Sequence, residues 1–361
     1  MTAVTHHAGD FLTLPWHCLT FRQRFLALRV GFPAPAGPVY SPAMAAPASL
    51  PTSAFALPAP TRRAVLGAGL GALVALTGCT GRVPRAPEPL RLATGPPGAV
   101  YREIGQAYAD ILRRAWPART VEVLHTAAAV ENARLIDGRD AELAFVNCDV
   151  AVEHPEIRAL SRVFDSVVHV VVPADSSIHS ATDLHGRAVA GGLAESGTRF
   201  VVTRLAELLG LRLDFHALSQ ADSVAALRAG RVDAVVSLTG MPTPAVSQLA
   251  AGGDVRLLDL TDEVATMAAE HPLDYFPVTI PATMYPPMAS VVTLAVPTLL
   301  VAHASMAADL ARYLTGLLFD HAEELSGVRP EASQINPRTG AATAPVALHP
   351  GARDWFRAAK P

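Results

Sequence analysis

The segment "TGPPGAVY", residues 94–101, joins a short apolar stretch to a long amphipathic one. No Gly-Lys-Ser/Thr follows it and GxGxxG spacing is absent, so it is neither a Walker phosphate loop nor a dinucleotide fingerprint. What remains is a helix N-terminus, whose first backbone N–H groups lack internal partners and attract anions. Thr94 offers a hydroxyl, and Gly98 lets the backbone approach a ligand closely. Tyr101 supplies a phenol or an apolar wall, or packs its ring in the core.

The segment "GGLAESGTRF", residues 191–200, repeats this arrangement of a strand end before a helix start. Ser196 and Thr198 flank Gly197, and each can face a ligand or cap the helix. Arg199 can add a charge-assisted bond to an anion, or it is a solvated helix residue. Two such N-termini facing each other across a cleft would hold a small carboxylate without covalent chemistry.

Further polar residues follow predicted strands. Asn132 can point its amide into the same cleft, and Asn147 and Asp149 come directly after the strand "AELAFV". Asp149 can pair with a substrate amine, or it caps the next helix. Cys148 is expected to be a small buried residue rather than a nucleophile, because no histidine is placed as its base.

Two Pro-rich loops, "TGMPTPAV" (239–246) and "ATMYPPM" (282–288), complete the candidate site. Gly240 allows close backbone approach, or it makes a plain turn. Tyr285 is a candidate cleft residue. Both loops are expected at one end of a second group of strands and helices.

Composition argues against several functions. The 361 residues carry 29 Lys and Arg against 32 Asp and Glu, so no basic surface suggests nucleic-acid binding. Three cysteines are too few and too scattered for a disulfide framework, and none of the 13 histidines has metal-site spacing. No GxSxG elbow and no acid/base pair of carboxylates is evident. The sequence therefore predicts no enzyme, metal or cofactor.

The N-terminal region predicts export. Residues 1–60 form a Pro-, Ala- and Ser-rich leader expected to be disordered, and a start at Met44 would leave a signal of normal length. Residues 61–79 join two arginines to an apolar run that is too short to span a membrane, as in a secretory signal. "LTGC" resembles a bacterial lipobox, which predicts a lipid on Cys79, unless Cys79 is an ordinary residue near a cleavage site. We expect a protein anchored by lipid outside the cytoplasmic membrane, or a periplasmic one, with residues 80–89 as a tether.

From residue 90 the chain alternates predicted strands and helices, which indicates an α/β fold with parallel strands. Ligand loops then gather at the carboxyl ends of the strands. Two long apolar segments, at 166–173 and 289–303, look like crossings between two lobes. We expect lobe 1 to hold residues 90–172 and 289–361, and lobe 2 to hold residues 173–288.

Five motifs, in order, resemble the TAXI family, the solute-binding subunits of tripartite ATP-independent periplasmic (TRAP) transporters. They cover nearly all of residues 90–357 and read "ATGPPGAVYREIG", "AAAVENARLIDGRDAELAFVNCDVA", "VHVVVPADSSIHSATDLHGRAVAGGLAESGT", "DSVAALRAGRVDAVVSLTGMPTPAV" and "HPGARDWF". The chain departs from the family at Ala128-Ala129 and Asn147-Cys148, where Gly-Ser and Gln-Ser are usual. These departures remove two hydroxyls and shorten one amide side chain at the expected ligand site.

The resemblance implies a type II periplasmic-binding-protein-like fold, two α/β lobes joined by two crossing strands with a ligand cleft between them. It also implies capture of glutamate, glutamine, 2-oxoglutarate or another C4–C5 dicarboxylate by hinge closure, followed by delivery to a TRAP-type membrane permease. The alternative is an exported sensor of the same fold that signals to a membrane partner.

Overall fold

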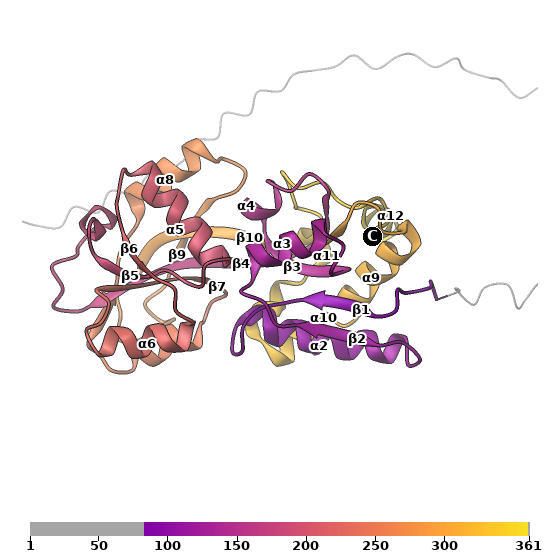
Figure 1. Cartoon of the computed structure of the whole chain (residues 1–361), viewed down its shortest axis with the longest axis horizontal. Helices are drawn as coiled ribbons and strands as arrows, with labels where there is room; N and C mark the ends of the chain where they lie inside the picture. Colours follow the sequence, from indigo (N-terminus) through magenta and orange to yellow (C-terminus); the bar gives the residue numbers. More distant parts are fainter. Residues whose placement is uncertain (1–82, 360–361) are drawn as a thin grey trace, which may run out of the picture. The chain divides into compact units, whose positions relative to one another are not determined.

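The computed structural model describes residues 83–359, so the leader, the signal at 61–79 and Cys79 lie outside the described residues. Within 83–359 no helix is both long and apolar enough to cross a bilayer. A ten-stranded sheet runs through this part in the order β2-β1-β3-β10-β4-β7-β5-β6, with β8 added to β4 and β9 to β10. Figure 1 shows the two lobes that this sheet connects, with β4 and β10 running between them.

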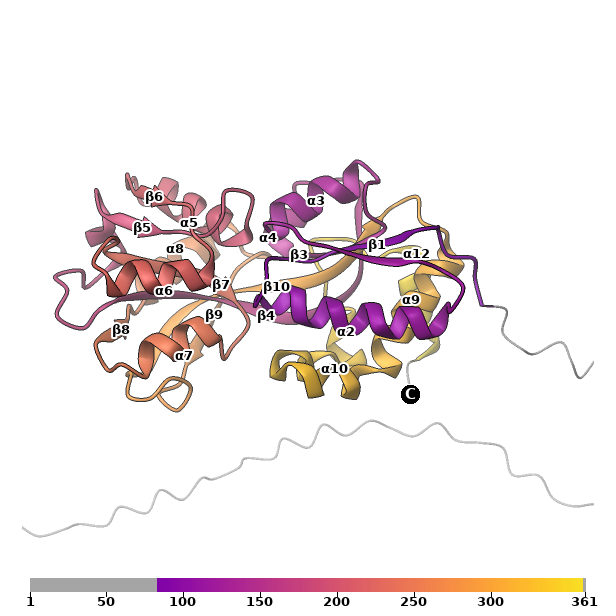
Figure 2. The same ribbon diagram turned by 60° about the horizontal axis from the view of Figure 1, so that its bottom comes forward.

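Lobe 1 begins with the predicted βαβαβ unit. Its elements are β1 (Leu90–Ala93), α2 (Val100–Ala115), β2 (Val121–Leu124), α3 (Ala129–Asp137), β3 (Leu143–Asn147) and α4 (Cys148–Ala151). β1 pairs in parallel with both β2 and β3. In α2, Ile104, Tyr108 and Ile111 face the core at helical spacing, and Arg113 and Arg114 in the last turn suit the helix dipole. Figure 2 shows α2 and α3 on opposite sides of these strands.

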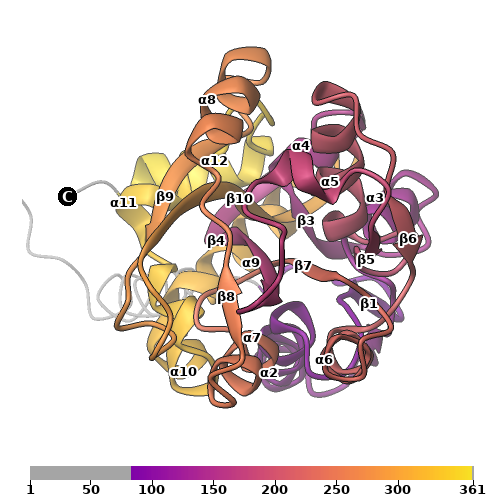
Figure 3. The same cartoon turned by 90° about the vertical axis from the view of Figure 1, so that its left-hand side faces the viewer.

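Lobe 2 repeats the arrangement of parallel strands and helices. Its elements are η1 (Ala181–Leu184), β5 (Ala188–Ala190), α5 (Gly197–Leu208), β6 (Asp214–His216), α6 (Gln220–Arg228), β7 (Ala234–Thr239), α7 (Pro244–Ala250), β8 (Val255–Leu257), α8 (Thr261–Glu270) and β9 (Phe276–Ile280). β5 pairs in parallel with β6 and β7. Viewed from this end, α5 and α6 lie on opposite sides of the sheet (Figure 3). The loop expected at 239–246 gives way to α7, which Pro244 begins at N1.

Two long antiparallel strands cross between the lobes: β4 (Ile157–Pro173) and β10 (Val291–His303). Both are buried along most of their length, as near-continuous apolar sequences require. Their register shifts between Thr298 and Leu299 and again between Leu300 and Val301. Such bulges bend a ladder locally, and these lie on the lobe 1 side, where residues 298–301 of β10 also pair with β3.

The chain then returns to lobe 1. The remaining elements are α9 (Ala308–Asp320), α10 (Ala322–Val328), η2 (Pro330–Gln334), α11 (Pro337–Gly340) and α12 (Pro350–Ala358). The Tyr108 hydroxyl donates to the Leu314 carbonyl at 2.7 Å, which ties α2 to α9 inside the core. One hydrophobic cluster fills lobe 1 and continues under α5, and a second lies between the sheet and α6 with α7. Lobe 1 therefore contains both ends of the described chain.

Candidate functional site

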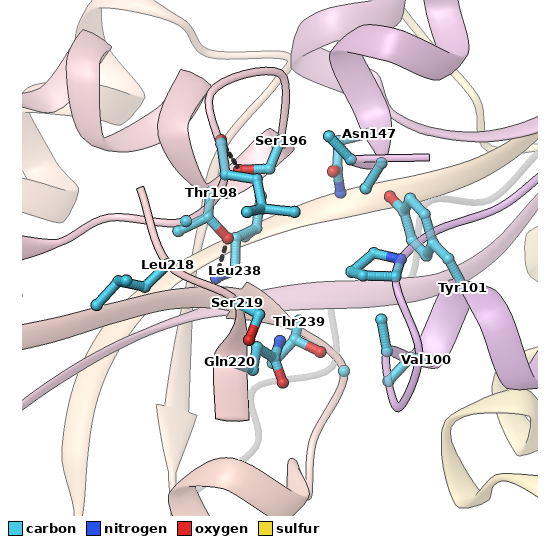
Figure 4. Close-up of a pocket in the computed structure, with 18 of the residues that line it drawn as sticks. Val100, Tyr101, Asn147, Ser196, Thr198, Leu218, Ser219, Gln220, Leu238 and Thr239 are labelled. Carbon is cyan, nitrogen blue, oxygen red and sulfur yellow. Dashed lines mark hydrogen bonds between the residues drawn. The ribbon is translucent and has the colours of Figure 1, made fainter. Parts of the chain in front are cut away.

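A cavity of about 70 Å³ lies between the lobes where β3 and β7 end. We call it the central cavity (Figure 4). None of the side chains that line it is charged, so its electrostatics come from backbone and neutral polar groups. The lining residues are Pro96, Ala99, Val100, Tyr101, Ala127, Ala128, Asn147, Phe164, Gly192, Leu193, Ser196, Gly197, Thr198, Leu218, Ser219, Gln220, Leu238, Thr239 and Gly240.

Three helices begin at the central cavity: α2 from lobe 1, and α5 and α6 from lobe 2. The backbone N–H groups of Val100, Tyr101, Gly197, Thr198 and Gln220 lie in their first turns. Within residues 83–359 none of the five donates a hydrogen bond to the protein. Helix N-termini also carry a partial positive charge, so this arrangement favours an anion.

The floor of the cavity is a buried hydroxyl network centred on Thr298 of β10. The amide nitrogen of Asn147 donates to the Thr298 hydroxyl at 3.3 Å, and the hydroxyls of Ser166 and Tyr101 lie 2.8 Å and 3.4 Å from it. Burial raises the pKa of Tyr101, so its phenol stays neutral. The network fixes the lobe 1 side of the cavity to the crossing strands.

Ala128, at the N-cap of α3, has φ 100° and ψ −136°, a conformation that normally requires glycine. The first turn of α3 is hydrogen-bonded to lobe 2. The N–H groups of Val130 and Glu131 both donate to the Glu195 carbonyl at 3.2 Å. α3 therefore helps to join the lobes and offers few free donors to a ligand.

On the same side of the cavity, side chains also bridge the lobes. Tyr275 of lobe 2 donates its hydroxyl to the Asp149 carboxylate at 2.8 Å, and Arg204 of α5 pairs with Glu153 at 2.6 Å. Glu153 is half exposed, so that ion pair contributes at most about 1 kcal/mol. Asp149 is fully buried, and burial raises its pKa to about 6. Asp149 therefore joins the lobes and does not face the cavity.

The opposite side is bridged by the C-terminal part of lobe 1. Arg329 pairs with the buried Glu331 at 2.6 Å and reaches the Pro242 carbonyl of lobe 2 at 3.5 Å. The Glu331 side chain also packs so closely on Gly240 that a Cβ at that position would overlap it. Contacts on both sides show that the lobes are closed around the central cavity.

Six of the predicted site residues line this cavity. They are Tyr101, Asn147, Ser196, Gly197, Thr198 and Gly240. Ser196 is also a cap, since its hydroxyl accepts from the Arg199 N–H, and Thr198 uses its hydroxyl to accept from the Leu238 N–H. The hydroxyls of these two residues thus bond within the protein, whereas the backbone N–H groups of Gly197 and Thr198 remain free for a ligand.

Thr94 and Asn132 do not reach the cavity. Thr94 is fully buried and donates its hydroxyl to the Leu124 carbonyl at 2.7 Å. The Asn132 amide nitrogen donates to the carbonyls of Thr94 and Phe145, and its oxygen accepts from Thr126. Their polar groups hold the strand ends of lobe 1 together, which corrects the expectation that they face a ligand.

Arg199 turns away from the cavity as well. Its guanidinium lies 4.0 Å from the centre of the Phe215 ring and contacts the carbonyls of Gly191 and Gly192 at 3.4 Å. The expected charge-assisted bond to an anion in the cavity is therefore not available in this arrangement.

Gly98 and Tyr285 have structural positions outside the cavity lining. Gly98, at φ 78°, makes the turn before α2. The Tyr285 hydroxyl accepts from the Thr243 N–H at 2.9 Å and lies 3.0 Å from His169 Nε2. Burial lowers the pKa of His169 to about 4, so its ring is neutral. Tyr285 thus supports the loop before α7.

Sequence analysis missed the lobe 2 wall of the cavity. Ser219 and Gln220 begin α6, Thr239 ends β7, and Phe164 lies on β4 between the lobes. A helix is predicted at 220–229, and the Ser-x-x-Asp pattern at 219–222 is a helix-start signal that could have marked Ser219 and Gln220 as another N-terminus for a ligand. Nothing in the sequence marks Phe164, because its position depends on where β4 crosses.

Within residues 83–359 no group of three or more His, Cys, Asp or Glu side chains is placed to hold a metal ion. Cys148 is buried with no disulfide partner among these residues, and burial raises its pKa to about 12. Its thiol is therefore protonated and unreactive at neutral pH.

A model of the family described as "NMT1-like family" matches residues 92–359. Among solved structures, the periplasmic aliphatic sulphonate binding protein SsuA from Escherichia coli is 17% identical, with 76% of this chain and 84% of that chain covered and a TM-score of 0.44. A putative L-cystine ABC transporter from Listeria monocytogenes is 12% identical, with 67% and 94% covered and a TM-score of 0.43. The regulatory domain of CcmR from Synechocystis PCC6803, in complex with 2-PG, is 14% identical, with 64% and 97% covered and a TM-score of 0.41. Similarities of this size to solved structures identify neither a ligand nor a partner.

Proposed function

Since this chain belongs to the NMT1-like family, we propose that it is an exported solute-binding protein that captures a small carboxylate between its lobes and delivers it to a membrane permease. The family comprises substrate-binding proteins rather than enzymes, in agreement with the prediction from sequence. The resemblance of five motifs to the TAXI family supports a TRAP-type permease as the partner. The resemblance of LTGC to a lipobox supports a lipid at Cys79 as the anchor.

The observation that carries this proposal is the uncharged cavity enclosed between two lobes, with unpartnered N–H groups from both lobes directed at it. A ligand that touches both lobes favours the closed arrangement by its differential contacts. β4 and β10 pair as long strands that connect the two lobes, so the hinge motion of opening would bend them where they cross.

The proposal is tested by thermal unfolding of the purified protein with a panel of small carboxylates. A ligand present at 100 times its Kd stabilises the folded state by about 2.7 kcal/mol, which raises Tm by several degrees. If no small carboxylate moves the midpoint, the proposal is wrong. Deleting the gene separates a carrier from a sensor: loss of a carrier abolishes uptake of the ligand, whereas loss of a sensor changes gene expression and leaves uptake capacity in place.

A further inference from the structure

We propose that the central cavity selects a monoanion: one carboxylate or sulfonate group on a short apolar body, without an ammonium group or a second charge. The inference rests on the proposed function and narrows it. On this inference the cavity binds monoanions more tightly than the dicarboxylates and amino acids that the resemblance to the TAXI family suggests.

One anionic group has a complete set of donors in the cavity. The free N–H groups of α2, α5 and α6 converge from both lobes, and the Thr239 hydroxyl joins them at the end of β7. Thr239 is 6% exposed, and among the described residues its hydroxyl has no hydrogen-bond partner. Because Thr239 lines the cavity and its hydroxyl is not committed to the fold, this group is available to donate to a ligand oxygen.

A second charge has no partner there. Arg199 is held on Phe215 and by two backbone carbonyls, and Arg102, which lies on α2, is not among the lining residues. Burying an unpaired carboxylate costs several kcal/mol even after relaxation. A dianion would therefore lose the affinity that its first carboxylate gains.

An ammonium group is disfavoured by the same surroundings. The predicted amine partner, Asp149, faces Tyr275 at the lobe junction, and no carboxylate lines the cavity. Three helix N-termini place partial positive charge around the space, so a cation is repelled there. A zwitterionic amino acid thus gains less than the matching simple acid.

The rest of the wall is apolar and suits a short carbon body. Val100, Phe164, Leu193, Leu218 and Leu238 line the cavity between the polar groups. The volume of about 70 Å³ restricts the ligand to a few carbon atoms in the closed arrangement. Burial of an apolar carbon chain in this part of the cavity adds affinity. A chain that ends in a second charged group would lose its hydration on burial and gain less.

The test compares ligands of one size on the full protein by isothermal titration calorimetry. The probes are butyrate, 1-propanesulfonate, succinate and 4-aminobutyrate. We expect butyrate or propanesulfonate to bind at least tenfold more tightly than succinate and 4-aminobutyrate, and the comparison of the first two identifies the head group. If succinate or 4-aminobutyrate binds as tightly as the monoanions, the inference is overturned while the proposed function stands. If none of the four binds, the inference is overturned, and the carboxylate panel described above decides the proposed function.

Thr239→Val tests the placement of the anionic group. Loss of one hydrogen bond to a charged group should weaken binding of the preferred monoanion by about tenfold. Thr315→Val is the matched control, because Thr315 is equally buried but donates within its own helix to the Ala311 carbonyl. Unchanged monoanion affinity in a folded Thr239→Val protein would contradict the proposed position of the head group.

Discussion

Gly197 is a point at which the two lobes approach each other tightly beside the cavity. It begins α5 in lobe 2, and an added Cβ would lie less than 3.0 Å from Asn147 Oδ1 and 3.2 Å from Ala129 Cβ, both in lobe 1. Because these neighbours belong to the other lobe, the overlap exists only while the lobes are closed. Gly197→Ala should therefore oppose closure and leave each lobe folded.

The size of the effect follows from the cost of overpacking. Forcing a methyl group into a filled space typically costs about 1–3 kcal/mol. If the cost falls entirely on the closed state, the apparent Kd of the ligand rises by roughly 5- to 150-fold. Asn147 also holds Thr298, so it cannot move aside without breaking the floor network.

The assay is calorimetric titration of wild type and Gly197→Ala with the tightest ligand of the panel, alongside urea unfolding without ligand. Gly327→Ala is the matched control, since Gly327 lies in α10 with nothing within 4 Å of an added Cβ. We expect weaker binding in Gly197→Ala alone, with little change in the unfolding midpoint of either variant. Unaltered affinity in Gly197→Ala would refute the idea that binding requires these lobes to close at this contact.

Three further predictions concern stability. Ala128→Gly should stabilise the protein by roughly 1 kcal/mol, because glycine removes the strain of the φ 100° conformation; a lowered urea midpoint would contradict this. Between about pH 4 and pH 6 the wild type should lose up to about 3 kcal/mol relative to Asp149→Asn as pH rises, because the raised pKa of Asp149 makes the folded state hold a proton that the unfolded state has released. Asp149→Asn should lack this loss in urea titrations, and the lowered pKa of His169, which acts in the opposite direction, is common to both proteins. Tyr285→Phe should cost about 1–3 kcal/mol by leaving His169 and the Thr243 N–H unsatisfied, without altering ligand affinity; a large loss of affinity would place Tyr285 in the site after all.

Most of the fold could be predicted from the hydrophobic periodicity of the sequence. Alternating apolar strands and amphipathic helices predict both α/β lobes, because each element buries one face or stripe in a way that sequence periodicity records. The runs at 166–173 and 289–303 predict the crossings for the same reason. β4 begins earlier than predicted, at Ile157, because polar residues such as Ser161 and Asp165 interrupt the apolar run without interrupting the pairing with β10.

The site was harder to predict from the sequence, because a polar residue near a strand end can either contact a ligand or bond to buried backbone groups of the protein. Asn132 and Thr94 resemble ligand contacts in the sequence, yet they satisfy buried carbonyls in lobe 1. Thr239 begins the candidate loop at 239–246, but nothing local marks it as a ligand contact, because its place in the cavity depends on where β7 lies relative to α2. Which polar group is left unpartnered depends on tertiary contacts that no single segment encodes.

The central claim, that a small anion is held between the lobes, is tested most directly by a crystal structure of the protein grown with its tightest-binding panel member. The account predicts density for the anion in the central cavity, with its head group at the first turns of α2 and α5 and within hydrogen-bond distance of the Thr239 hydroxyl. Density for the anion outside this cavity, with the space between the lobes filled by side chains, would contradict it.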